Sequence, residues 1–244
     1  MVAGGASAQS KGVSTQTTAS SQQQMVLRQT NRKVVLYRNA ARHWQSLMGH
    51  HHTQSSYAAN HIKSVNYASW VLKLWKQRAQ RLHAQARHWM VRRTKSYRAG
   101  IALMRGTMGI SPGPARQLAS SGSIEARYNQ MRKLNRVTLS RWRHPPHESQ
   151  LMCIHGYEGS WNDTRNPKYK GGLQTDIYFE ATYGPNLVRK YGGYIAVDSA
   201  GHHYAVGGHS DLWTPLEQMW AAENAIRSRG FSPWPYTAHE CKLI

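Results

Sequence analysis

The clearest hydrophobic pattern in the chain lies between Ser69 and Tyr97, where apolar residues recur at the spacing of one helix face. The apolar stripe comprises Val71, Trp75, Ala79, Leu82, Ala86, Trp89 and Met90. Lys73, Lys76 and Arg87 lie on the other face. A period of about 3.6 residues with one apolar and one basic face predicts an amphipathic helix. Two roles are open for it: packing on its own domain, or binding an anionic membrane or polymer.

Residues 1–24 show no such pattern. They are mainly Ser, Thr, Gln, Gly and Ala. A polar, low-complexity composition buries too little apolar surface to fold, so the sequence predicts a disordered tail. The same residues lack the apolar core of a secretory signal, which leaves an upstream start, unconventional export or delivery by a phage as the expected routes.

Helical spacing begins near Met25 and continues, with one interruption, to the Pro145-Pro146 step. Ser111-Pro-Gly-Pro114 interrupts it and is predicted to be a linker, because proline and glycine break helices. A second basic helix is expected from about Ile124 to Arg143. Residues 25–147 are therefore predicted to form a basic helical extension.

The pattern changes after the proline step, where glycine, tryptophan and tyrosine become frequent. Tyr169–Thr175 is expected to be a turn entering a short extended segment, and Val197–His209 a hairpin or loop. Thr214 and Glu217 have the spacing of a capping box, which predicts a helix from Thr214 to Arg229. The pattern alone predicts a small helical domain with a few extended pieces over residues 148–244.

Charge divides the chain at the same place. Residues 1–147 hold 24 Lys and Arg residues and one acid, whereas residues 148–244 hold 8 Lys and Arg residues and 10 acids. The formal net charge of +21 implies a polyanionic partner, namely nucleic acid, anionic lipid or an anionic wall polymer, unless it serves only solubility. The sequence contains no zinc-finger spacing or RNA-recognition motif, so nucleic acid is the least favoured partner. No apolar run reaches the roughly 18 residues of a membrane span.

The two cysteines of the chain, Cys153 and Cys241, lie near the ends of the near-neutral part. This placement predicts a disulfide that closes the domain, which implies an oxidising location, extracellular or in the cell wall. Two unpaired buried thiols are the alternative. His50-His51-His52 is too weak a signal to predict a metal site, and no cofactor is expected.

Glu158 is the main candidate for chemistry. Few acids precede it, and it is flanked by Tyr157 and Trp161. Apolar neighbours raise the pKa of a carboxyl group, and a raised pKa is what a general acid needs near neutral pH.

Four motifs follow one another at close spacing in the C-terminal part. They are Cys153-x4-Glu158-Gly-Ser-Trp161, Asn166-Pro-Lys-Tyr169-Lys-Gly-Gly-Leu-Gln174, Trp213-x4-Gln218 and Gly230-x3-Trp234-Pro-x5-Cys241. Together they resemble the transglycosylase-like family that includes the actinobacterial resuscitation-promoting factors. The resemblance is strongest to members with a basic helical extension ending at a Pro-Pro step. It implies an α+β, lysozyme-like domain, mostly helical with a small β-sheet, over residues 148–244.

The resemblance also implies an activity, cleavage of peptidoglycan between N-acetylmuramic acid and N-acetylglucosamine. By position, Glu158 matches the catalytic glutamate, and Gly171–Gln174 matches the turn that enters the small sheet beside the cleft. The candidate substrate-binding residues are Gln174, Tyr169, Gly172, Trp161 and Asp176. Glycine lets backbone approach a sugar, and the Gln174 amide both donates and accepts hydrogen bonds. Tyr169 is expected to face the cleft, whereas Trp161 fits a core position at least as well.

A single-glutamate mechanism fits better than a carboxylate pair. Asp163 and Asp176 are the nearest acids in sequence, and neither matches a second catalytic position of the family. Glu158 would protonate the glycosidic oxygen, the substrate's own N-acetyl oxygen or 6-hydroxyl would attack, and Glu158 would then act as base. Attack by the 6-hydroxyl gives a 1,6-anhydro product and defines a lytic transglycosylase, whereas attack by water defines a lysozyme. The sequence leaves both activities open. Thr175 stands where the family has a large apolar residue, which is expected to loosen the packing behind the cleft.

Two other functions are left open beside this one. The domain is alternatively a non-catalytic module that binds the wall or has a structural role there. A nucleic-acid-associated protein, acting through its basic N-terminal part, is the less favoured alternative. In the enzymatic interpretation, residues 25–143 bind anionic wall polymers or a membrane surface and concentrate the protein there.

Overall fold

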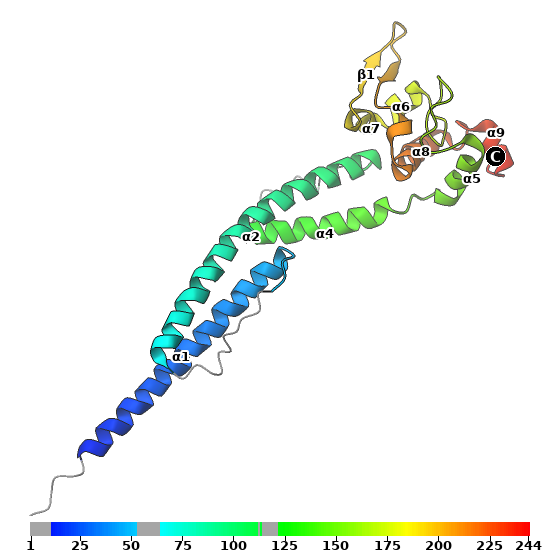
Figure 1. Cartoon of the computed structure of the whole chain (residues 1–244). Helices are drawn as coiled ribbons and strands as arrows, with labels where there is room; N and C mark the ends of the chain where they lie inside the picture. The colour runs from blue at the N-terminus through cyan, green and yellow to red at the C-terminus, as the bar shows by residue number, and fades with distance from the viewer. Residues whose placement is uncertain (1–10, 53–63, 112, 114–121) are drawn as a thin grey trace, which may run out of the picture. The chain divides into compact units, whose positions relative to one another are not determined.

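The computed structural model describes residues 11–52, 64–111, 113 and 122–244, and divides the chain into two compact units, Met1–Arg92 and Arg93–Ile244. The described residues are mostly helical, with a small two-stranded antiparallel sheet (Figure 1). This confirms the α+β class. None of the described helices is both long enough and apolar enough to cross a membrane.

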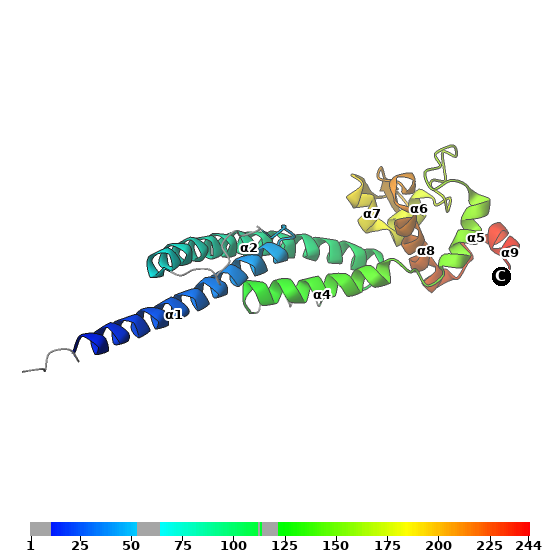
Figure 2. The ribbon, with the colours of Figure 1, turned by 60° about the horizontal axis from the view of Figure 1, so that its bottom comes forward.

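The first unit is built from two long helices, α1 (Lys11–Leu47) and the first part of α2 (Val65–Thr107), which lie side by side (Figure 2). Their shared core consists of Val34, Ala41, Ala68, Val71, Trp75 and Ala79. Val71, Trp75 and Ala79 belong to the apolar stripe seen in the sequence, so this face of α2 packs on its own unit. Lys73, Lys76 and Arg87 are exposed.

Two predicted boundaries differ from the structure. Helix α1 begins at Lys11, so residues 11–24 of the expected disordered tail are helical, whereas residues 1–10 lie outside the described residues. Residues 11–24 contain no proline, and a helix propagates cooperatively into a segment that nothing interrupts. The two compact units meet between Arg92 and Arg93, inside α2, whereas the sequence pattern predicts a domain boundary at residues 147 and 148. Pro112 and Pro114 of the predicted linker lie outside the described residues.

The second unit begins with the rest of α2 and with α4 (Ile124–Trp142). Ile101 of α2 and Met131 of α4 are fully buried in one small core. At the end of α4, the Trp142 ring stacks on Trp220 with 5.9 Å between centroids, and the Trp142 carbonyl accepts a 2.7 Å hydrogen bond from Trp220 Nε1. These contacts place the last part of α2 and the whole of α4 in the second unit, which explains why the unit boundary lies inside α2 and not after α4.

The remaining elements are short and surround a second apolar core. They are α5 (Glu148–Glu158), α6 (Ile177–Tyr183), α7 (Pro185–Lys190), β1 (Tyr194–Val197), β2 (His203–Val206), the 3-10 helix η2 (Ser210–Leu212), α8 (Pro215–Arg229) and α9 (Pro235–Glu240). Strands β1 and β2 form an antiparallel hairpin with Tyr194 opposite Val206. The core includes Leu151, Ile154, Leu173, Leu187, Ala222 and Trp234.

Several local predictions can be compared with these elements. The capping box of α8 is present, with Thr214 and Glu217 bonded to each other's backbone, and the hairpin overlaps the predicted segment Val197–His209. The extended segment expected after Tyr169 is reduced to one antiparallel bridge between Lys170 and Thr175. The reason lies in Asp176, whose carboxylate accepts a 2.7 Å hydrogen bond from Phe179 N and so starts α6 at once.

Candidate active site

Glu158 is the last residue of α5 and is half-buried. Its Oε1 accepts a 2.9 Å hydrogen bond from Thr237 Oγ1, and no ion pair to its carboxylate occurs within the described part of the chain. Burial raises the pKa of Glu158, and the hydrogen bond from Thr237 offsets part of the rise. A partly accessible carboxyl group with a raised pKa and one neutral partner has the properties of a general acid.

Helix α5 is held at its start and at its middle. At its start, the His147 backbone N–H donates a 2.6 Å hydrogen bond to Glu223 Oε1, and His147 Nδ1 lies 3.1 Å from Glu223 Oε2. Further along, the predicted disulfide joins Cys153 to Cys241, which caps α9. Because Thr237 lies on α9, the disulfide links the helix that ends at Glu158 to the helix that holds its hydrogen-bond partner.

The turn that follows is fixed by Gln218, which is only 2% exposed. Its Oε1 accepts a 2.8 Å hydrogen bond from Gly172 N, and its Nε2 donates to Trp161 O at 2.7 Å and to Ser210 O at 2.8 Å. Gly171 has φ of +72° and lies so close to Gln218 that a Cβ atom there would be 2.6 Å from Oε1. Gln218 therefore ties the turn to the loop after Glu158 and to η2.

Two residues predicted to bind substrate, Gly172 and Trp161, pack against α5. Gly172 is buried, and a Cβ atom on it would lie 2.7 Å from His155 Nδ1 and 2.8 Å from Trp161 Cε3. The Trp161 ring stacks on His155 with 3.9 Å between centroids. Both residues are thus needed to seat the turn on α5, because only glycine fits under this ring pair.

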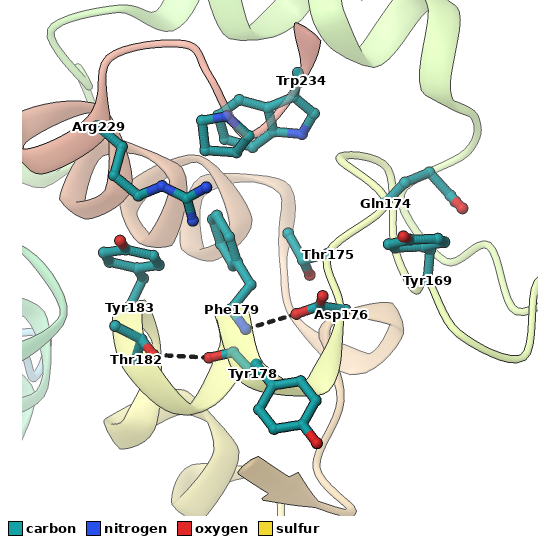
Figure 3. Close-up of a pocket in the computed structure, with 11 residues that line it drawn as sticks. Tyr169, Gln174, Thr175, Asp176, Tyr178, Phe179, Thr182, Tyr183, Arg229 and Trp234 are labelled. Carbon is teal, nitrogen blue, oxygen red and sulfur yellow. Dashed lines mark hydrogen bonds between the residues drawn. The ribbon is translucent and has the colours of Figure 1, made fainter. Parts of the chain in front are cut away.

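The other three predicted residues, Tyr169, Gln174 and Asp176, line one pocket of about 280 Å³ (Figure 3). The pocket lies between the turn, α6, the end of α8 and the segment before α9. Its lining consists of Tyr169, Gln174, Thr175, Asp176, Tyr178, Phe179, Thr182, Tyr183, Arg229, Pro233 and Trp234. Five aromatic rings and a few polar groups suit a sugar, which presents apolar faces and hydroxyl edges.

The polar groups of the pocket are partly used by the protein itself. Gln174 Nε2 donates a 2.9 Å hydrogen bond to Gly171 O, and Asp176 Oδ1 accepts the bond from Phe179 N that caps α6. Gln174 Oε1 and Asp176 Oδ2 have no hydrogen-bond partner among the described residues. Both oxygens are therefore available to accept hydrogen bonds from a ligand.

Glu158 does not line this pocket, but a short segment connects the two. Trp234 forms one pocket wall and is held by a 2.7 Å hydrogen bond from its Nε1 to Leu173 O. Thr237, which binds Glu158, follows Trp234 by three residues, one turn further along. The pocket and the Glu158 carboxyl group are therefore both positioned by residues 234–237. Thr237 was missed in the sequence because nothing before the fold relates it to a residue 79 positions earlier.

Two other acids, Asp163 and Glu180, differ from Glu158 in their hydrogen-bond partners and in their access to a substrate. Asp163 is buried and forms a 2.6 Å ion pair with Arg165, whose hydrogen bonds lower the pKa of Asp163 to about 2. Glu180 is 1% exposed and accepts hydrogen bonds from Ser210 N at 2.7 Å and from His209, although burial raises its pKa. Asp163 stays ionised and Glu180 is closed off from a substrate, so neither matches the accessible proton donor that Glu158 offers.

Within the described ranges, no group of three His, Cys, Asp or Glu side chains is arranged to hold a metal ion. Comparison with known proteins finds no family model, no curated protein and no solved structure that matches this chain.

Proposed function

We propose that the protein cleaves the glycan strands of peptidoglycan between N-acetylmuramic acid and N-acetylglucosamine, with Glu158 as the proton donor. The observation that carries the proposal is the state of Glu158: half-buried, bound by one hydroxyl group and raised in pKa. The motifs around Glu158, Gln174, Gln218 and Cys241 resemble the transglycosylase-like family, and the proposal includes its lysozyme-like fold for the C-terminal elements.

In the proposed mechanism the Glu158 carboxyl group acts first as an acid and then as a base. Protonated Glu158 donates its proton to the glycosidic oxygen as the bond to the anomeric carbon breaks, and the leaving sugar departs as an alcohol. The carboxylate then removes a proton from the nucleophile that attacks the anomeric carbon. Water as nucleophile gives a reducing end, and the substrate's own 6-hydroxyl gives a 1,6-anhydro end. Asp163 takes no part, because Arg165 keeps it ionised.

The pocket supports a role in holding a neighbouring sugar. The Gln174 and Asp176 oxygens that lack a partner accept hydrogen bonds from hydroxyl or amide groups, and Tyr169, which is 41% exposed, offers a ring for stacking. Trp234 forms one wall of the pocket and lies three residues before Thr237, which binds Glu158.

The basic helices support delivery to an anionic surface. Glu125 is the first acidic residue of the chain, so α1 and α2 carry basic charge with no acid to balance it. On α2, Tyr67, Trp70 and Leu74 are 41%, 47% and 40% exposed. We include in the proposal that the basic surface of α1 and α2 concentrates the protein on the anionic polymers or membrane of a bacterial envelope. The proposed location is extracellular or in the cell wall, which the disulfide supports.

A binding module without turnover is the second candidate, because the pocket lining excludes Glu158. Incubation of the full chain with isolated peptidoglycan, followed by mass spectrometry of the soluble products, separates the two. Release of muropeptides is expected, and their anhydro or reducing ends identify the nucleophile. Strands that bind the protein but release no fragments would reject the enzyme and favour the module.

A further inference from the structure

Arg229 lines the pocket, and its guanidinium makes no hydrogen bond or ion pair with any described residue. Arg165 is paired with Asp163 at 2.6 Å, and Arg227 donates to Met108 O at 2.8 Å. Arg229 lies in the last turn of α8, is exposed, and lines the pocket. It is therefore a cation placed at a cavity and available for a ligand.

The walls around Arg229 favour a particular kind of ligand. Figure 3 shows the side chain reaching from α8 into the pocket beside Tyr183, Phe179 and Trp234. A guanidinium group presents a planar fork of donors that matches the two oxygens of a carboxylate. Asp176 lines another part of the pocket and disfavours an anion there, so an anionic group is directed to Arg229.

We propose that the pocket binds a saccharide that carries a carboxylate, with Arg229 forming a bidentate pair with that carboxylate. The identity of the ligand class rests on the proposed function, since it is the muramyl residue of a glycan strand that bears such a group. The carboxylate comes either from the lactyl ether of the sugar or from the peptide attached to it. A volume of about 280 Å³ is close to the lower end of the range for small-molecule pockets, which suits a single sugar residue.

Binding by the full-length Glu158→Gln protein, measured by isothermal titration calorimetry, tests this inference without interference from turnover. The ligands are a muramyl disaccharide with a free lactyl carboxylate and its methyl ester. In this background, Arg229→Gln is expected to weaken binding of the acid about tenfold and to leave the ester unchanged, because a charge-assisted pair is lost only with the acid. Arg229→Lys is expected to fall between the two, since a lysine lacks the fork.

Arg189→Gln is the matched control. Arg189 is exposed at the end of α7, outside the pocket lining, and the substitution removes the same charge. It is expected to leave binding of both ligands unchanged. A loss of the same size with Arg189→Gln would overturn the inference. So would the absence of any effect of Arg229→Gln on binding of both the free-acid disaccharide and a disaccharide that carries a peptide.

A second pair of ligands identifies the source of the carboxylate. If Arg229→Gln weakens the peptide-free disaccharide, the lactyl group is the partner; if it weakens only the disaccharide carrying a peptide, the peptide supplies the carboxylate. Failure of the wild-type protein to cleave strands, together with Arg229-dependent binding, would reject the catalytic proposal and leave the pocket assignment intact.

Discussion

Among the described residues, the Glu158 carboxylate has one hydrogen-bond donor, the Thr237 hydroxyl 2.9 Å away, and Thr237 is 5% exposed. Because this bond favours the ionised form, replacing Thr237 by the isosteric valine is expected to raise the pKa of Glu158 further. The general acid must be protonated in the free enzyme, so the basic limb of the pH profile of kcat/KM is expected to move to higher pH.

Thr237→Ser is the control for this prediction. It keeps the hydroxyl group and is expected to keep the limb near its wild-type position. A profile that does not move in Thr237→Val, in a protein that still turns over, would show that Glu158 is not the group whose protonation limits the reaction.

Asp163 gives a prediction about stability and pH. Its pKa is lowered from an ordinary value of 3.8 to about 2 by Arg165, so the ion pair stabilises the fold fully above about pH 4 and loses that effect as the pH falls towards 2. Asp163→Asn is therefore expected to lower the melting temperature at pH 6, with the difference from wild type shrinking between pH 4 and 2. Thermal unfolding followed by circular dichroism measures it, and a difference that is constant with pH would contradict the ion-pair account.

At the scale of elements, the turn after Lys170 depends on Gly172, which packs against the stacked rings of His155 and Trp161. Gly172→Ala places a Cβ atom 2.9 Å from Trp161 Cα, which is backbone and cannot rotate away. Overpacking of this kind is expected to cost about 1–3 kcal/mol in the free energy of unfolding, measured by urea titration.

Gly156→Ala is the matched control, because Gly156 lies in α5 and a Cβ atom added to it would have nothing within 4 Å. Alanine is the better helix former, so this variant is expected to gain roughly 0.5–1 kcal/mol. Equal effects of the two substitutions would contradict the packing role given to Gly172.

The elements also show which features of the fold can be predicted from the sequence. The α2 stripe and the α8 capping box were predictable, because the 3.6-residue period and the spacing of Thr214 and Glu217 are local properties. The start of α1 at Lys11 was not predictable, because a polar segment can continue a helix that is stabilised by apolar residues further along the chain. The same distinction holds for the site. Glu158 was predicted from its neighbours in the sequence, whereas the position of Arg229 in the pocket depends on contacts that form only in the folded chain.

At the scale of the whole molecule, the uneven charge predicts binding that depends on salt. Replacing Lys73, Lys76 and Arg87 by glutamine is expected to weaken pelleting of the full chain with cell walls that carry anionic polymers. The loss is expected at about 0.05 M salt and to vanish at about 0.5 M, where exposed charges are screened.

A triple variant at Lys168, Arg189 and Lys242 removes the same charge from exposed positions of the second unit. It is expected to pellet nearly as well as the wild type. If both triple variants lose binding equally, net charge alone explains the attraction and the basic face of α2 has no special role.

The most direct test of the central claim compares wild type, Glu158→Gln and Glu148→Gln on isolated peptidoglycan, with soluble muropeptides quantified by mass spectrometry. Glu148 lies on the same helix, is exposed, and carries the same functional group. Wild type and Glu148→Gln are expected to release muropeptides at similar rates, and Glu158→Gln at least about a hundredfold more slowly, because the proton donor is lost. Equal release by Glu158→Gln and wild type would contradict the assignment of Glu158 as the catalytic acid.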